Sequence, residues 1–158
     1  MLCLKFRIGN ERYALDTTQL VEVLPLVKIT PVPQAPAGVA GLIVYRGKFV
    51  PVIDLSEMAL SKAAPSHIST RLILVRYGEE LLGLIAEQAT DVMRCDAGSF
   101  SDTGVSSDST PYLGRATQHE GELVRLIEVR DLLPLSVSSV LFRQAKEDAW
   151  STPASPRY

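Results

Sequence analysis

The chain has few of the residues on which metal centres, disulfide frameworks and nucleophilic catalysis depend. Its 158 residues include two cysteines and two histidines, His67 and His119, which are too scattered to form a metal site. Cys3 and Cys95 belong to no paired motif, so no disulfide framework is implied and a reducing cytoplasm is expected. A nucleophile elbow, a P-loop and a G-x-G-x-x-G motif are all missing. We therefore expect no catalytic residue, no metal and no cofactor.

Long apolar runs and concentrated positive charge are also missing. The apolar run "GVAGLIVY" (38–45) is far shorter than the roughly 20 residues that cross a bilayer. The start, "MLCLKFRIGNERY", has no extended apolar segment and no small-residue cleavage site, so no signal peptide is expected. The formal net charge is −2 and no block of lysine and arginine occurs, so neither nucleic acid binding nor direct membrane insertion is expected.

The chain does contain an internal repeat. Residues 2–24 match residues 71–93 at a constant offset of 69, and residues 49–59 match residues 123–133 at an offset of 74. In this alignment Gly47 falls on Gly121 and Gly41 on Gly114, with one residue inserted between. Order and spacing persist over most of the chain, which indicates a duplicated structural unit.

Each copy contains short β-strands separated by turns that are rich in glycine and proline. Leu2, Leu4, Phe6 and Ile8 alternate with more polar residues, which is the pattern of a half-buried strand. Gly9-Asn10 and Arg46-Gly47 are expected hairpin turns, and the prolines between 31 and 36 exclude a helix there. Segment 17–24 is compatible with a helical turn or an extended strand. The pattern predicts an all-β fold of two small barrels related by duplication.

The expected boundaries follow from composition. The first barrel is predicted mainly over 12–66 and the second mainly over 70–134, joined by a linker rich in Ala, Ser and Pro. The first strand, 1–9, is a candidate to be shared between the barrels, so that 1–136 form one domain. Residues 137–150 have apolar residues at helical spacing and predict a short C-terminal helix, followed by a disordered tail over 151–158.

Two charged residues stand out within the first copy. Arg46 interrupts two apolar strands, "GLIVY" and "KFVPVIDL". An arginine at a hairpin turn is commonly just solvated, but its guanidinium also pairs well with carboxylates, and Glu22 is the best-placed candidate partner.

The neighbouring Leu20 and Val23 can belong to the core or to an apolar groove that receives a helix; pattern alone favours the core. Asp54 and Glu128 occupy equivalent places and suggest a structural role at the ends of strands.

The segment "VEVLPLVKITPVPQAPAGVAGLIVYRGKFVPVIDL" (21–55) resembles the signature of the CheW-like domain family. Typical members show a Glu-Val or Glu-Ile pair, a proline-marked link, G-x-x-N-L-R-G and a V-P-V-I-D-L strand. The resemblance extends from "FRIGNERYALD" to "GELVRLIEVRDLL" and covers residues 2 to about 134. It implies two five-stranded SH3-like β-barrels packed around a shared hydrophobic core.

The resemblance also implies a function. Members of the family are non-catalytic adaptors that couple the helical cytoplasmic tips of methyl-accepting chemoreceptors to the regulatory domain of a CheA-type histidine kinase. The expected location is therefore the cytoplasm, at receptor arrays on the inner face of the membrane. Carried onto this chain, the receptor-binding positions are Leu20, Glu22, Val23, Gly41 and Arg46. The resemblance does not place the kinase-binding residues.

The chain departs from the family pattern before the Arg-Gly turn, where Val44 and Tyr45 replace Asn and Leu. The change removes an amide that can form hydrogen bonds and adds an amphipathic ring, so both positions are candidates for receptor specificity. It suits an alternative chemosensory pathway, such as a Wsp-like surface-sensing one. The alternative function is an SH3-like module that binds extended or proline-rich peptides. Such a module would need an exposed aromatic groove, although aromatics make up only 6% of the chain. A hydrolase with an unrecognised site is the third hypothesis.

Overall fold

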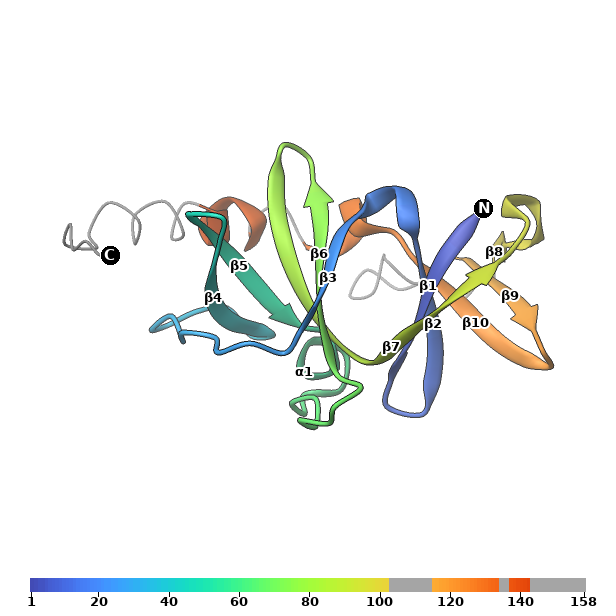
Figure 1. Cartoon of the computed structure of the whole chain (residues 1–158), viewed down its shortest axis with the longest axis horizontal. Coiled ribbons are helices and arrows are strands. Elements are labelled where there is room, and N and C mark those ends of the chain that lie inside the picture. Colours follow the sequence, from blue (N-terminus) through green and yellow to red (C-terminus); the bar gives the residue numbers. More distant parts are fainter. Residues whose placement is uncertain (103–114, 134–136, 143–158) are drawn as a thin grey trace.

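Strands of two packed β-barrels account for most of the described residues. The computed structural model describes residues 1–102, 115–133 and 137–142. Figure 1 shows the barrels side by side along the long axis, with the N-terminus at the second barrel. The strands are β1 Leu2–Ile8, β2 Glu11–Asp16, β3 Leu20–Pro25, β4 Val39–Tyr45, β5 Lys48–Asp54, β6 Arg71–Tyr77, β7 Glu80–Arg94, β8 Ser101–Asp102, β9 Arg115–His119 and β10 Glu122–Ile127.

Helical structure is limited to short pieces. Helix α1 spans Leu55–Leu60, and single 3-10 turns occur at η1 Thr17–Gln19, η2 Ala97–Ser99 and η4 Val129–Asp131. Residues 137–142 are helical and lie within the predicted C-terminal helix. The remainder of that prediction, 143–150, and the predicted tail, 151–158, lie outside the described residues. Segment 17–24, for which the sequence left two alternatives, begins with η1 and continues as β3.

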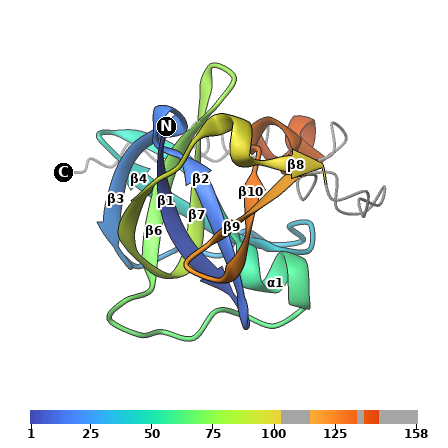
Figure 2. The same ribbon diagram turned by 90° about the vertical axis from the view of Figure 1, so that its right-hand side faces the viewer.

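The first barrel is a sheet in the order β3-β6-β7-β5-β4, and the second has the order β7-β1-β2-β10-β9-β8. Strand β7 belongs to both sheets, with residues 80–86 pairing in the first and 87–94 in the second. It bends at Gln88, whose φ is +51°, next to a shift in the register of its pairing with β1. In Figure 2, which looks onto the second barrel, β7 lies beside β1.

The composition of the barrels differs from the expected division of the chain. The sequence predicts β2 in the first barrel and β1 as a candidate to be shared, but both lie in the second barrel, where β1 pairs with β7 and β2 with β10. Conversely, β6 and the first half of β7 lie in the first barrel, where they pair with β3 and β5. Strand β7, not the first strand, is shared. Each copy therefore contributes its opening hairpin to the other copy's barrel, which the local pattern of hydrophobicity cannot reveal because the hairpin has the same apolar face in either place.

The internal repeat is visible in the pairing of the strands. In the first barrel Ile53 of β5 pairs in parallel with Leu84 of β7, and in the second Ile127 of β10 pairs in parallel with Leu15 of β2. These residues correspond through the two sequence offsets. The antiparallel pair Glu22 and Leu74 likewise corresponds to Asp91 and Lys5. The two copies thus share one register, which confirms that the repeat in the sequence is a structural duplication.

Strand register changes one detail of that alignment. Gly41 pairs with Val52, and the equivalent pair in the second barrel is Arg115 with Leu126. Arg115, and not Gly114, therefore stands where Gly41 does. Gly114 lies outside the described residues.

Three hydrophobic clusters hold the fold together. One fills each barrel, and the largest lies between the barrels and draws equivalent residues from both copies, such as Leu15 and Leu84 or Ile53 and Ile127. These four side chains are at most 2% exposed. Burying a large aliphatic side chain contributes roughly 1.5–3 kcal/mol, so a shared cluster of this size makes the two barrels one folding unit.

Candidate functional site

The residues singled out in the sequence lie on the two edge strands of the first sheet and on the turn between β4 and β5. Leu20, Glu22 and Val23 are on β3, and Gly41 is on β4. Among the described residues, strand β3 pairs only with β6, and β4 pairs along its length only with β5. An isolated bridge between Thr30 and Leu42 supplements β4. The candidate receptor site is therefore built across two strands that are not hydrogen-bonded to each other.

Arg46 lies in a tight turn between β4 and β5. Strands β4 and β5 are joined by two residues, and both Arg46 and Gly47 have positive φ, at 50° and 79°. This is the conformation of a type I′ turn, whose twist matches that of the flanking strands. Gly47 adopts it freely, while for an arginine the left-handed region costs on the order of 1 kcal/mol. The turn holds the Arg46 side chain outward, where it is 77% exposed.

The structure brings Arg46 and Glu22 together. The nearest guanidinium nitrogen of Arg46 lies 3.8 Å from Oε1 of Glu22, and the guanidinium also stands over the ring of Tyr45, 5.2 Å from its centre. The pair joins the β4–β5 turn to β3 across the open side of the sheet. An exposed pair of this length contributes at most about 1 kcal/mol to stability, because water and salt screen both charges. Its importance lies in positioning charge at the surface.

The apolar members of the candidate site are less accessible than its charges. Leu20 and Val23 are half-buried and pack against the cluster between the barrels, as pattern alone favoured. Tyr45 is also half-buried and packs against the interior of the first barrel. Val44, in contrast, is 66% exposed. Of the two positions at which the chain departs from the family pattern, Val44 is the one whose side chain is exposed to solvent.

Gly41 is buried and cannot itself offer a side-chain contact. Its φ is +145°, and a β-carbon there would lie 2.1 Å from the carbonyl oxygen of Thr30. Thr30 and Leu42 exchange two backbone hydrogen bonds, of 2.9 and 2.8 Å, so the proline-marked segment before β4 crosses directly over the glycine. Gly41 therefore acts on the candidate site by letting that segment pack against β4.

Strand β5, the last strand of the first copy, ends at the buried carboxylate of Asp54. Asp54 is 5% exposed, and its side chain accepts hydrogen bonds from the backbone N–H groups of Ser56, Glu57 and Ala64 at 3.0, 3.2 and 3.0 Å. It thereby caps helix α1 and fixes the segment that follows it. The structural role expected for Asp54 is confirmed. The equivalent Glu128 makes no capping hydrogen bond and pairs with Arg115 instead.

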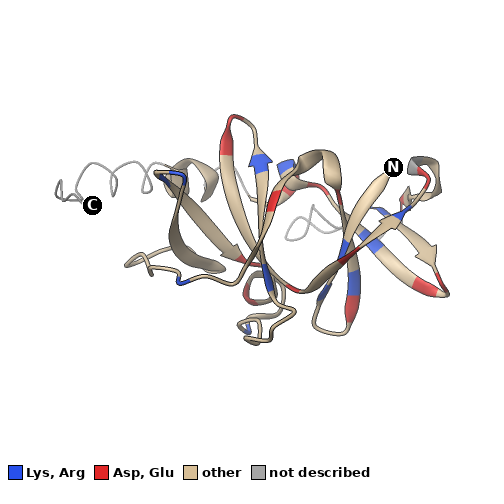
Figure 3. Cartoon of the chain, in the orientation of Figure 1, with Lys and Arg blue, Asp and Glu red and all other residues tan. Residues whose placement is uncertain are grey.

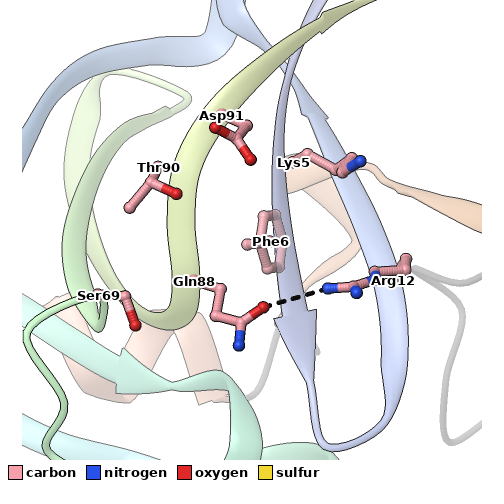
Figure 4. Close-up of a pocket in the computed structure, with 7 residues that line it drawn as sticks. All are labelled: Lys5, Phe6, Arg12, Ser69, Gln88, Thr90 and Asp91. Atoms are coloured by element: carbon pink, nitrogen blue, oxygen red, sulfur yellow. Dashed lines mark hydrogen bonds between the residues drawn. The ribbon is translucent and has the colours of Figure 1, made fainter.

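The hairpin β1–β2 and its neighbouring strands carry pockets that sequence reasoning did not find. Figure 4 shows one, of about 270 Å³, where Phe6 lies among polar side chains from β1, β2 and β7. Arg12 donates a hydrogen bond of 3.2 Å to Gln88 and also pairs with Glu122 at 3.0 Å. A second pocket is lined by residues of β2 and β10, including Leu123 and Arg125. Arg125 pairs with Glu11 at 3.3 Å, so the arginines of both pockets already have acidic partners and the pockets indicate no particular ligand.

Two hairpin turns of the first barrel carry opposite charges. In Figure 3 the β4–β5 turn is positive, with Arg46 and Lys48, and the β6–β7 turn is negative, with Glu79 and Glu80. Within the described residues no group of three or more His, Cys, Asp or Glu side chains is arranged to hold a metal ion. The same residues contain no helix that is long and apolar enough to cross a membrane.

The structure is thus a double barrel in which a charged, exposed turn lies beside an edge strand of the first sheet, and comparison with known proteins identifies its family. The chain belongs to the CheW-like domain family, whose model matches residues 2–136. This confirms the resemblance seen in the sequence.

Individual proteins agree with this assignment. The chain is 26% identical over 131 residues to "Chemotaxis protein CheW" of Rhizobium meliloti (strain 1021), covering 82% of this chain and 84% of that protein. It is 26% identical over 131 residues to "Protein FrzA" of Myxococcus xanthus, covering 81% and 82%. The crystal structure of the scaffolding protein TtCheW from Thermoanaerobacter tengcongensis superposes with a TM-score of 0.78, at 26% identity over 86% of this chain and 89% of that one. The predicted fold of two SH3-like barrels is thus confirmed.

Proposed function

We propose that this chain is a non-catalytic adaptor that couples methyl-accepting chemoreceptors to a CheA-type histidine kinase. Membership of the CheW-like family and similarity to proteins named for chemotaxis and scaffolding support the proposal. The observation that carries the site assignment is the Glu22–Arg46 pair, which lies at the surface between two edge strands. The adaptor acts in the cytoplasm, at receptor arrays on the inner face of the membrane.

The receptor contact is assigned to the first barrel. Arg46 offers a cation that is 77% exposed, Glu22 a carboxylate beside it, and Val44 an exposed apolar side chain on the same hairpin. A receptor tip is a bundle of helices whose surface mixes apolar and charged residues. The three side chains together can contact both kinds of residue. Leu20 and Val23, on the same strand as Glu22, pack against the cluster between the barrels and so anchor β3, and Gly41 lets the proline-marked segment pack against β4. Contacts of this kind in signalling are commonly small and transient.

Reversing the charge at Arg46 tests the site. We expect Arg46→Glu to weaken binding of a receptor cytoplasmic fragment about tenfold, which is about 1.4 kcal/mol, because the substituted carboxylate faces Glu22 and repels acidic groups of the partner. Binding of the kinase regulatory domain should be unchanged. Isothermal titration with each partner, identified by co-purification from the native cell, measures both effects.

The matched control is Glu120→Arg. Glu120 occupies the equivalent turn in the second barrel, also has a positive φ, at 52°, and is also followed by a glycine. It should leave receptor binding unchanged. If the wild-type chain binds neither receptor nor kinase, the adaptor function is wrong; if it binds both and Arg46→Glu binds the receptor equally well, only the site is wrong.

The pathway that the adaptor serves is proposed to be an alternative chemosensory one, of a Wsp-like kind. Support comes from Val44 and Tyr45, which replace the Asn and Leu of the family pattern beside Arg46. Restoring those residues in the double variant Val44→Asn, Tyr45→Leu should shift preference toward receptors of flagellar chemotaxis. Competition between two receptor fragments measures the shift. If the ratio of the two affinities is unchanged, Val44 and Tyr45 do not determine specificity.

The alternative, an SH3-like module for proline-rich peptides, has less support. Within the part of the chain that the structure describes, every aromatic side chain is buried or half-buried, and Tyr45 is covered on one face by Arg46. A proline-rich ligand needs exposed aromatic faces side by side. Titration with a library of proline-rich peptides separates the two functions.

A further inference from the structure

The only two cysteines of the chain, 92 positions apart in sequence, meet in the second barrel. Their Sγ atoms lie 3.3 Å apart, and both cysteines are free thiols. Cys3 is on β1, fully buried inside the barrel, and Cys95 follows the last residue of β7 and is partly exposed. From the geometry we infer that this pair is an oxidation site, at which a hydroperoxide converts the two thiols into an intrachain disulfide.

The strand register explains why the two sulfurs meet. Cys3 pairs directly with Met93, so Cys95, two residues further on, projects from the same face of the sheet as a diagonal neighbour. A backbone hydrogen bond of 2.9 Å from the Cys95 N–H to the Met1 carbonyl continues the ladder past the end of β7. Both side chains pack in the cluster that fills the second barrel. The backbone itself therefore holds the thiols together.

Bond formation requires only a small local movement. A disulfide bond is about 2.05 Å long, so the sulfurs must approach by about 1.3 Å from their separation of 3.3 Å. Cys95 lies one residue beyond the end of β7 and shortly before the turn η2, so we expect the movement at this end of the strand. The disulfide would tie β1 to the end of β7.

The first barrel shows that thiols are not needed at these places for packing. Through the offset of 69, Leu72 stands where Cys3 does and Leu26 where Cys95 does, and both leucines belong to the cluster that fills the first barrel. An ordinary apolar contact is thus sufficient for this fold. The second barrel instead has two sulfurs in contact, the arrangement from which a disulfide forms.

The surroundings fix the order of the two steps. Burial raises the pKa of Cys3 to about 12, assisted by the hydrogen bond with Cys95 and the nearby charge of Asp16, so Cys3 is a protonated thiol at neutral pH. Cys95 is the one that solvent reaches. Its sulfur, after losing its proton to water, attacks one oxygen of the hydroperoxide; the O–O bond breaks, Cys95 becomes a sulfenic acid, and the leaving oxygen is protonated.

The second step closes the pair. Sγ of Cys3 attacks Sγ of Cys95, the S–O bond breaks, and the departing hydroxide takes the proton of the Cys3 thiol. With hydrogen peroxide the balance is two thiols and one peroxide giving one disulfide and two waters, and the two electrons pass from sulfur to oxygen. The inference concerns the second barrel alone and stands whether or not the adaptor function does.

Titration of the full reduced chain with hydrogen peroxide tests the inference. Samples are quenched with N-ethylmaleimide under denaturing conditions and weighed by intact mass spectrometry. We expect both thiols to be lost together, so that the oxidised chain carries no maleimide and weighs two hydrogens less than the unlabelled reduced chain; dithiothreitol should restore both thiols. The oxidised chain should also melt on the order of 5–10 °C higher, because the bond closes a loop of 92 residues.

Two single variants decide the mechanism. Cys3→Ser should accumulate a sulfenic acid at Cys95 that dimedone traps, since the resolving thiol is gone, and Cys95→Ser should leave Cys3 unmodified in the folded protein. Persistence of both thiols in the wild type, trapping of its Cys95 by dimedone with Cys3 still free, or a disulfide between two chains would each overturn the inference.

Discussion

The two barrels have the same strand register and very different surfaces. Their equivalent strands pair residue for residue, and equivalent apolar residues from both build the cluster between them. Yet the first barrel presents Arg46 at its β4–β5 turn, while the second presents Glu120 at the matching turn between β9 and β10. Backbone pairing and the shared core tolerate few changes, whereas an exposed turn residue changes freely. The surface difference is therefore where the two copies can differ in function.

The barrels also differ inside. Leu74 and Ile85 in the first barrel correspond to Lys5 and Asp16 in the second, which are only half-buried. The first interior is thus the more apolar of the two. The polar pocket of Figure 4, which Lys5 helps to line, lies on the second barrel. The first barrel thus has a closed hydrophobic interior, while the second has polar groups at its rim.

The largest difference in stability is expected at the glycines. Gly41→Ala should lower the free energy of unfolding by about 3 kcal/mol or more, because the added methyl group meets the Thr30 carbonyl oxygen at 2.1 Å on a backbone with positive φ. Gly121→Ala, with open space around its β-carbon, should cost only about 1 kcal/mol. Urea denaturation of both variants measures the difference, and equal losses would contradict the close approach at Gly41.

An intermediate difference is expected at the residues that end the last strand of each copy. Asp54→Ala should cost about 2–4 kcal/mol, because it leaves three buried or partly buried backbone N–H groups without their acceptor. Glu128→Ala should cost less than about 1 kcal/mol, since it removes only a partly exposed ion pair. The same denaturation experiment compares them. A loss at Glu128 as large as that at Asp54 would show that both carboxylates act as caps.

The smallest effect is expected at the charged turn. A double-mutant cycle of Glu22→Ala and Arg46→Ala should give a coupling of less than about 0.5 kcal/mol in stability, because the pair is long and exposed. The same cycle measured on receptor affinity should give a clearly larger coupling if the pair acts in recognition. A coupling in stability as large as that in affinity would assign the pair to the fold instead.

Much of the fold could be predicted from local pattern. The alternation from Leu2 to Ile8, the two-residue turns with Gly9 and Gly47, and the repeat at offsets of 69 and 74 all reappear as strands, hairpins and duplicated register. Strand identity depends on neighbouring residues and on turn chemistry, which the sequence displays directly.

The assignment of strands to barrels was only partly predictable. Hairpin β1–β2 has the same apolar face whether it pairs with its own copy or with the other, so the exchange of hairpins leaves no mark in the periodicity. The pairing of Glu22 with Arg46 could be proposed from their chemistry, but their separation depends on how the open edges of the sheet curve toward each other. The pockets on the second barrel escaped prediction for the same reason, since their walls come from strands distant in sequence.

The amino-acid order by itself determined the duplicated strands, the turns that join them and the family to which the chain belongs, because each depends on residue type and spacing along the backbone. Only the tertiary structure decided which hairpin enters which barrel, that Gly41 lies under Thr30, and that Cys3 and Cys95 meet. These outcomes depend on contacts between segments tens of residues apart, which form when the two copies bury their common apolar face against each other.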